Sequence, residues 1–268
     1  MTDEVVLNMT ADLRMLVETS KFGAEEVARN QRLICENVLR ESEHLDSGNF
    51  TEIHPTDLRQ LFDEYDRCFF ESQIGTTLRD TPLGFRLSKR MTRTAGRTVR
   101  YGGPGHPDGS RYEISVSTEL LFQCFRGNDH RSVTVAGIAC ADRLEALQRV
   151  MEHELVHLLE WVLWSTSSCS ALRFQSIASR VFSHESHTHQ LITPSERALE
   201  QFGVAAGDYV RFKCGSVHHV GTVTRITKRA TVLVGDSRGS MSSDGRKYAT
   251  YYVPVERLEV VRNHLVKD

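Results

Sequence analysis

Two histidines and a glutamate in the middle of the chain have the residue types and spacing of a metal-dependent hydrolytic site. The segment reads His153-Glu154-Leu155-Val156-His157. Because residues four apart lie on one face of a helix, both imidazoles can bind the same Zn²⁺ ion. Glu154 lies beside that pair, where it can take a proton from a water bound to the zinc as that water attacks a carbonyl carbon. The pattern predicts a zinc hydrolase with His153 and His157 as metal ligands and Glu154 as the catalytic residue.

A long amphipathic helix is expected to carry this motif. Asp142 can cap its first turn, with Glu145 three residues later as in a capping box. Apolar residues then recur every three or four positions and form a core-facing stripe: Leu144, Leu147, Met151, Leu155, Leu158 and Val162. After a serine-rich break at 166–170, a second helix is expected from about Ala171 to Phe182. If the two helices form an antiparallel hairpin, the chain after Phe182 returns toward the turn that carries His153.

The rest of the chain predicts an α+β protein with two domains. The first 75 residues have a helical pattern, and three short strand-like runs with a hairpin loop at 102–109 predict a small antiparallel sheet between 83 and 121. A short helix is framed by Thr193 and Gly203. Beyond Gly207, four or five short strands predict a small SH3-like β-barrel. We expect an N-terminal helical extension at 1–55, the domain with the motif at 56–193, a helical linker at 194–206 and the barrel at 207–268.

Length and composition are those of a globular chain. It has 268 residues, 40% of them hydrophobic and 25% charged, which argues against a disordered or collagen-like protein. The most apolar run, 155–164, contains a glutamate and is about half the length that a bilayer requires, so no membrane partner is expected. No export signal begins the sequence, and the six cysteines form no C-x-x-C pair. We therefore expect reduced thiols and a cytoplasmic protein, associated with the nucleoid if it binds DNA.

Charge is unevenly distributed along a chain whose net charge is only −2. Residues 86–100 carry six basic side chains and no acidic one, and residues 201–268 carry 11 basic and 6 acidic ones. These two segments can face DNA, with the tyrosines of the barrel available to stack on bases. The alternative is that the basic side chains only solvate one face of a sheet. The expected partners are a protein or peptide substrate and DNA. The sequence does not indicate which oligomeric state the protein adopts.

Several segments resemble the SprT/Spartan family of metalloproteases. Residues 153–161 (HELVHLLEW) closely resemble the metal-binding helix of that family, and residues 65–70 (YDRCFF) resemble its Tyr-x-x-x-Phe-Phe helix. Residues 88–96 resemble its Ser-x-Arg-Met segment followed by glycine, and 114–121 its next strand and the turn into a helix. The resemblance covers about residues 58–192 in the order of the family. It implies a zincin-like domain and zinc-dependent peptide hydrolysis, with relatives that act on proteins crosslinked or otherwise attached to DNA.

The third zinc ligand departs from the family pattern. The position where the family often has its third histidine falls on Ser170, and a serine hydroxyl is a poor zinc ligand. We expect His184 as the replacement, because an antiparallel hairpin would bring it back toward the metal. Cys169 and His189 remain alternatives. His189 belongs to a Thr-His element that resembles one in relatives with a complete ligand set, which favours a substrate-polarising or structural role, and His187 is expected to be a solvated loop residue.

A second hypothesis places the chain in a different class. If the ligand set is incomplete, the protein would be a non-catalytic zinc-containing module that binds nucleic acid or protein through its barrel. Glu154 discriminates between the two hypotheses, because a purely structural zinc site has no use for a free carboxylate at that place. We therefore favour the enzyme.

Overall fold

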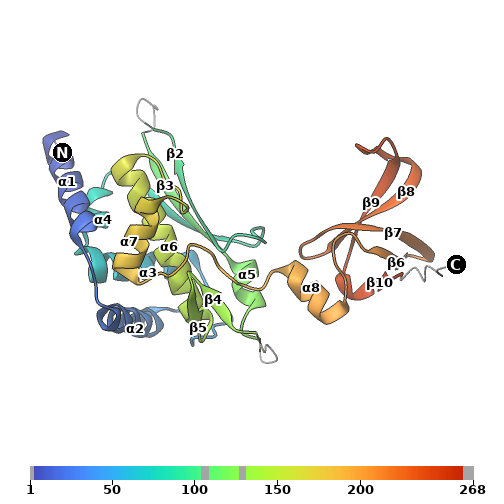
Figure 1. Ribbon diagram of the computed structural model, residues 1–268, viewed down its shortest axis with the longest axis horizontal. Coiled ribbons are helices and arrows are strands. Elements are labelled where there is room, and N and C mark those ends of the chain that lie inside the picture. The colour runs from blue at the N-terminus through green and yellow to red at the C-terminus, as the bar shows by residue number, and fades with distance from the viewer. Residues whose placement is uncertain (1–2, 104–108, 127–130, 262–268) are drawn as a thin grey trace. The chain divides into compact units, whose positions relative to one another are not determined.

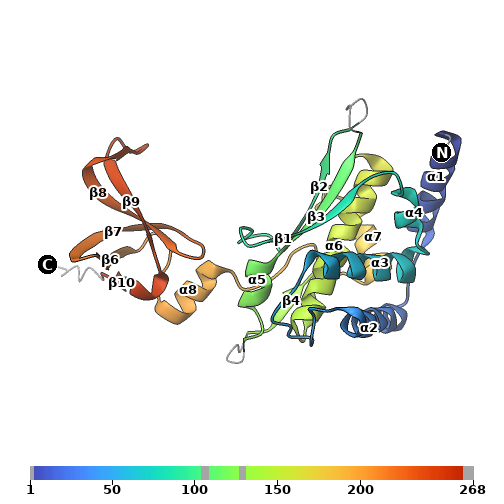
Figure 2. The same cartoon turned by 180° about the vertical axis from the view of Figure 1, so that it is seen from behind.

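The computed structural model describes residues 3–103, 109–126 and 131–261, and it confirms the α+β class. The chain divides into two compact units, Met1–Leu191 and Ile192–Asp268 (Figures 1 and 2). Within the described residues, none of the helices combines the length and apolarity needed to cross a membrane. All six cysteines are free, as the sequence predicted.

Four helices form the first part of unit 1. They are α1 (Asp3–Thr19), α2 (Ala24–Glu41), α3 (Pro55–Phe70) and α4 (Gln73–Thr77). The expected N-terminal extension is not separate from the domain that follows, because α1 and α2 contribute to the same core. Leu13, Val17 and Ile34 are completely buried. Gln31 of α2 also donates a hydrogen bond to Glu152, a neighbour of the metal motif.

A three-stranded sheet lies next in unit 1, with the strand order β1-β3-β2. Its strands are β1 (Leu83–Ser88), β2 (Gly96–Tyr101) and β3 (Arg111–Ser117). β2 and β3 pair antiparallel, whereas β1 runs parallel to β3. The prediction of a purely antiparallel sheet was therefore wrong for β1. Strand-like alternation reveals which side chains share a face but not which strand lies between two others. The centre of the loop expected to join β2 to β3, at 104–108, lies outside the described residues.

The motif helix and its partner follow. In chain order, the remaining elements of unit 1 are α5 (Thr118–Gln123), β4 (Val133–Val135), β5 (Ile138–Cys140), α6 (Arg143–Trp164) and α7 (Leu172–Phe182). Asp142 caps α6 by accepting a hydrogen bond from the Glu145 N–H at 2.9 Å, as predicted. The reciprocal half of the expected capping box differs, because the Glu145 carboxylate accepts from the Ala141 N–H instead of the Asp142 N–H. The β4–β5 hairpin was not predicted, since each of its strands is only three residues long.

Unit 2 is a small sheet covered by one helix. It contains α8 (Pro194–Phe202), β6 (Tyr209–Cys214), β7 (Val217–Ile226), β8 (Ala230–Met241), β9 (Lys247–Val253), the single 3₁₀ turn η1 (Val255–Arg257) and β10 (Glu259–Val260). The strand order is β10-β6-β7-β8-β9, so β10 and β9 are the two edges. The expected closed barrel is therefore not found among the described residues, because no pairing joins these two strands.

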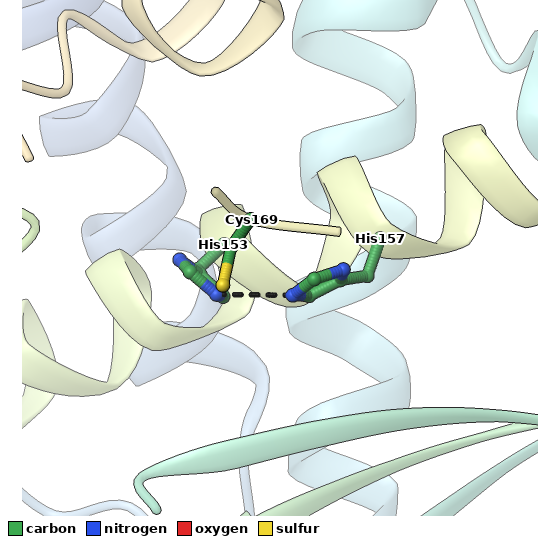
Figure 3. A group of neighbouring side chains, drawn as sticks. All are labelled: His153, His157 and Cys169. Carbon is green, nitrogen blue, oxygen red and sulfur yellow. Dashed lines mark hydrogen bonds between the residues drawn. The ribbon is translucent and has the colours of Figure 1, made fainter. Parts of the chain in front are cut away.

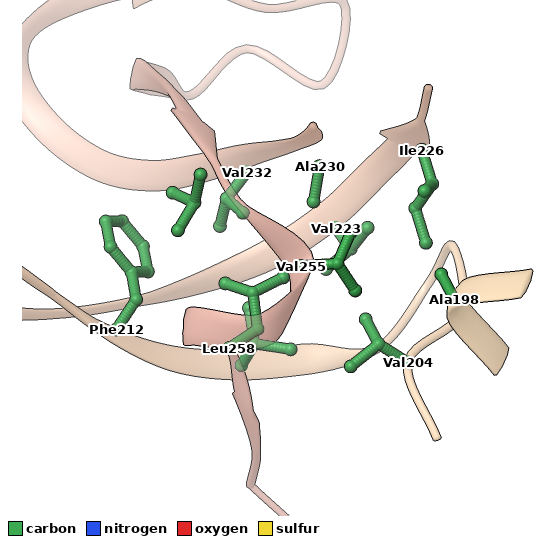
Figure 4. Packing of buried hydrophobic residues seen from close by; sticks show 11 residues of the cluster. Ala198, Val204, Phe212, Val223, Ile226, Ala230, Val232, Val255 and Leu258 are labelled. Atoms are coloured by element: carbon green, nitrogen blue, oxygen red, sulfur yellow. The ribbon is translucent and has the colours of Figure 1, made fainter. Parts of the chain in front are cut away.

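The core of unit 2 includes part of the expected linker. Ala198 of α8 and Val204 after it pack with Val223 and Val232 of the sheet (Figure 4). Thr193 caps α8 with a capping box to Glu196, as the sequence predicted. The helix is thus not a linker: one apolar face of α8 completes the core of the second unit.

Candidate metal centre

The two motif histidines face each other along α6. Their Nε2 atoms are 3.1 Å apart, as expected for residues one turn apart on the same helix face. Phe174 of α7 packs against both rings, with centroid distances of 4.8 Å to His153 and 4.6 Å to His157. The α6–α7 hairpin predicted from sequence therefore provides an apolar back wall for both imidazoles.

Cys169, in the turn between α6 and α7, completes a group of three possible metal ligands. One ligand atom from each of His153, His157 and Cys169 lies within 4.8 Å of the other two, and the three side chains converge in Figure 3. A tetrahedral zinc ion would separate its ligand atoms by about 3.3–3.6 Å, given zinc–nitrogen and zinc–sulfur bonds of about 2.0 and 2.3 Å. The observed nitrogen separation of 3.1 Å is close to that value. Two imidazoles and a thiolate therefore fit zinc, with a fourth position left for substrate or water.

His184 does not join this group, which corrects our first choice for the third ligand. Its Nε2 atom lies 2.8 Å from Oε2 of Glu152, a fully buried carboxylate that also accepts a hydrogen bond from the Tyr65 hydroxyl. Consecutive residues on a helix point about 100° apart, so Glu152 holds His184 on a different face of α6 from His153. The chain after α7 does return toward α6, but it brings His184 to the core side of the helix.

His187 and His189 lie on a wall of the site rather than among the three ligand atoms. Both line the same cavity as His153 and His157. Their segment is fixed to the β4–β5 hairpin by an isolated β-bridge between Val135 and His189, and by a hydrogen bond from the Ala136 N–H to the Thr188 carbonyl at 2.8 Å. His187 was expected to be a solvated loop residue; it is a half-buried loop residue that also lines the cavity.

Glu154 is buried beside the histidines and is positioned by β2. Thr98 donates a hydrogen bond to its Oε2 atom at 2.7 Å. Burial raises the pKa of Glu154 to about 7, although the hydrogen bonds from Thr98 act in the opposite direction. The carboxyl group also occupies the space above Gly96, where a Cβ atom would lie only 2.4 Å from Oε1. The glycine is therefore required for the carboxyl group to fit against β2.

Both imidazoles are uncharged near neutral pH. Burial lowers the pKa of His153 to about 3, with a smaller contribution from the neighbouring histidines. Burial likewise lowers the pKa of His157 to about 4, although Glu160 raises it. Neutral imidazoles are the form that binds metal ions, so no proton has to leave these side chains when an ion binds at pH 7.

The three ligand atoms open into a cavity of about 360 Å³. It is lined by α6, by β2 with the residues just before it, and by β4 with the 187–189 segment. β2 is an edge strand of its sheet. A cavity with an apolar lining, a few polar groups and a strand edge on one side has the features of a peptide-binding cleft.

Sequence reasoning missed the residues that support the site from other elements. The contacts of Gly96 and Thr98 with Glu154 depend on how β2 crosses α6, for which the sequence has no signal. Ser167 lies 2.6 Å from Nδ1 of His157, and it belongs to a serine-rich break that the sequence marks only as a turn. Glu160, which bonds Ser167, carried a usable signal, because it lies three residues after His157 on the same side of the helix.

The site was compared with known proteins through the whole chain. Comparisons with models of protein families, with curated proteins and with solved structures found no match to this chain.

Proposed function

We propose that unit 1 is a zinc-dependent metallopeptidase of SprT/Spartan type, with a zincin-like fold. His153, His157 and Cys169 would hold the zinc ion, and Glu154 would be the catalytic residue. The observation that carries the proposal is the arrangement of three converging donor atoms with a buried carboxyl group in one open cleft. A structural zinc site needs neither the cleft nor the carboxyl group.

Zinc, when bound, supplies a Lewis acid that polarises the scissile carbonyl and makes a water molecule more acidic. Glu154 would accept a proton from the attacking water and pass it to the leaving amine as the peptide bond breaks. A pKa of about 7 suits a group that must both accept and donate a proton at neutral pH. Thr98 holds the carboxyl group in position through the hydrogen bond to Oε2.

The substrate would bind as an extended peptide along β2. Residues 94–98 line the cleft, and the outer edge of β2 pairs with no other strand in the described part of the chain. Backbone groups at such an edge can pair with an added strand, which would place a peptide bond in the cleft beside β2. His187 and His189 line the cavity as well, so the substrate carbonyl would lie beside their imidazoles.

Part of the basic segment at 86–100, residues 94–98, lines the cleft, and this supports a DNA-associated protein as substrate. Lys89, Arg90 and Arg93 are exposed on the connection that leads from β1 to the cleft-lining part of β2. Since Thr98 faces α6, Arg97 points to the other face of the sheet, where Arg86 is paired only loosely with Glu113 at 3.8 Å. The exposed cations of the connection at 89–93 would attract a phosphate backbone beside the cleft, and Arg86 and Arg97 would attract it to the other face of the sheet.

The test is the Glu154→Gln variant. Zinc content by atomic absorption should stay at the wild-type level, because Gln keeps the size of the side chain and the ligands are untouched. Cleavage of a DNA-bound protein substrate, and of unfolded casein, should fall to background. Glu145→Gln on the first turn of the same helix is the matched control and should keep both properties. Wild-type cleavage by Glu154→Gln would exclude the proposed mechanism.

A second candidate function, nucleic-acid binding, concerns unit 2 alone. Val210 and Phe212 point into the core, so Tyr209, Arg211 and Lys213 of β6 lie on the outer face of the sheet. The register places Arg225 and Tyr252 on that face as well, and Tyr252 is 66% exposed. Cations beside exposed tyrosines suit a single-stranded nucleic acid, even though Glu259 lies opposite Arg211. The SH3-like assignment of this sheet stays a prediction.

Fluorescence anisotropy with a labelled single-stranded oligonucleotide tests this second function. Arg211→Glu in the full chain should weaken binding and reduce its dependence on salt, whereas Arg238→Glu on the β8–β9 hairpin should have a smaller effect. Equal binding by wild type and Arg211→Glu would exclude the outer face of unit 2, without bearing on peptidase activity.

A further inference from the structure

A chain of hydrogen bonds leads from the metal centre to a buried ion pair. Nδ1 of His157 lies 2.6 Å from Oγ of Ser167, and Ser167 donates its hydroxyl proton to Oε2 of Glu160 at 2.9 Å. The other carboxylate oxygen of Glu160, Oε1, accepts a hydrogen bond from Nε of Arg173 at 2.7 Å. Glu160 is completely buried, and its Oε2 also accepts from the Ser168 N–H at 3.1 Å.

The direction of each proton in this chain follows from the chemistry of its members. A carboxylate only accepts hydrogen bonds, and a serine hydroxyl has one proton to donate. Because that proton goes to Glu160, Oγ of Ser167 must accept from His157. Nδ1 of His157 therefore carries a proton, and in a neutral imidazole this leaves Nε2 with a free lone pair. Nε2 is the atom that faces His153 in the metal centre.

We propose that Glu160, acting through Ser167, is a positioning residue that fixes His157 in the tautomer able to bind a metal ion. The inference rests on the proposed metal centre but not on peptidase activity. Within the described part of the chain, no comparable hydrogen bond fixes Nδ1 of His153. In the absence of an ion, its Nε2–H can donate to Nε2 of His157, and it can exchange tautomers when an ion binds. On the same face of α6, the tautomer of His157 is thus fixed before an ion binds, whereas the tautomer of His153 can change.

The surroundings keep Glu160 in place for this role. It projects from α6 three residues after His157, and Ser165 ends the helix with a φ of 57°, which turns the chain so that Ser167 returns to both side chains. Arg173 reaches back from α7, and its guanidinium also lies 4.7 Å from the centre of the Trp164 ring. A carboxylate this buried and this fully hydrogen-bonded has little freedom to turn away.

The decisive variant is Glu160→Gln, because it keeps the shape of the side chain, reverses the hydrogen bond with Ser167 and takes the acceptor away from the Ser168 N–H. Arg173 still donates to the Oε1 position, and because a charged guanidinium is a stronger donor than a backbone N–H, the carbonyl oxygen of the new amide lies there. The amide NH₂ then takes the place of Oε2 and donates to Ser167, whose own proton turns to Nδ1 of His157. His157 would then carry its proton on Nε2, where it blocks metal binding.

The primary measurement is the tautomer of His157, read from ¹⁵N NMR of the histidine side chains in the metal-free full chain. Wild type and the control Glu145→Gln should show the proton on Nδ1, and Glu160→Gln should show it on Nε2. Zinc affinity, measured by competition with a chromophoric chelator, should fall about 10- to 100-fold in Glu160→Gln. Ser167→Ala should lose the tautomer preference and show a smaller fall in affinity, because His157 is then free to adapt.

A merely structural role for Glu160 predicts a different result. In that case Glu160→Gln would lower the melting temperature while the proton stayed on Nδ1, and this outcome would overturn the proposal. Should Glu160→Gln fail to fold, Ser167→Ala decides, since an unchanged Nδ1–H tautomer there also overturns it. Neither readout depends on cleavage, so a protein with the expected tautomers and no peptidase activity would refute the proposed function alone.

Discussion

Gly96→Ala is a direct test of the role proposed for Glu154, because a single methyl group would collide with its carboxyl group. A Cβ at this position would lie 2.4 Å from Oε1, 2.6 Å from Cγ and 2.8 Å from Cδ of Glu154, whereas ordinary contacts begin at 3.4 Å. The carboxyl group must therefore retreat by about 1 Å. Gly96 is not among the glycines with a positive φ, so the substitution introduces no backbone strain of its own.

The expected result is a large loss of activity with the metal retained. A displacement of about 1 Å at a reacting group costs on the order of 10²-fold in rate. We therefore expect kcat/KM for a peptide substrate to fall about 100-fold in Gly96→Ala, with zinc content unchanged, since the methyl group faces Glu154 and not the histidines.

Gly84→Ala on β1 is the matched control for this prediction. It lies in the same sheet, and its new Cβ would meet its nearest atom, the Tyr112 carbonyl oxygen, at an ordinary 3.8 Å. This variant should keep wild-type kcat/KM. If Gly96→Ala and Gly84→Ala are equally active, the position of the Glu154 carboxyl group does not limit the reaction, and its assignment as the catalytic base is wrong. Loss of zinc from Gly96→Ala would instead refute the assumption that the methyl group affects only Glu154.

Two further predictions concern the metal ligands and their protonation. Cys169→Ala should lose most of its zinc at limiting metal concentration, whereas His184→Gln should keep zinc but unfold at a lower temperature, because it disturbs the bond to Glu152; zinc retained by Cys169→Ala would return the third ligand to the remaining candidates. The metal-free protein should lose stability as the pH falls from 6.5 toward 4. In this range His153 and His157 bind protons in the unfolded chain but stay neutral when they are buried in the folded protein. With a pKa of about 4 in the folded state, His157 alone would account for a loss on the order of 3 kcal/mol at pH 4. Thermal unfolding of chelator-treated protein between pH 6.5 and 4 measures how stability depends on pH. His157→Gln should reduce this dependence; equal pH dependence in wild type and His157→Gln would contradict the role given to His157.

The features that sequence predicted correctly are those encoded within one element. The Asp142 cap and the apolar stripe define α6. The capping box of Thr193 and the left-handed Gly203 at the C-cap define α8. The spacing of His153 and His157 alone was enough to place both imidazoles together, because the α-helix puts residues four apart on the same face.

The features that sequence could not predict depend on how separate elements meet. Whether Cys169 or His184 approaches the histidines is decided by two turns whose key residues, Ser165 and Ser183, have φ values of 57° and 60°. Serine is not a residue that marks such left-handed positions in a sequence, as glycine does. The parallel pairing of β1 and the fit of Glu154 above Gly96 likewise arise only when strands and helix are assembled.

The third possible ligand, Cys169, lies in the turn after α6 and not on the helix itself, so metal exchange would depend on motion of the chain. His153 and His157 belong to a rigid helix, but Cys169 belongs to the short connection that leads into α7. A bound ion would therefore crosslink α6 to the connection that leads into α7. The ion could leave only when the connection between α6 and α7 moves away from α6. The rate at which a chelator extracts the metal would therefore measure how often this connection opens, which the equilibrium affinity does not reveal.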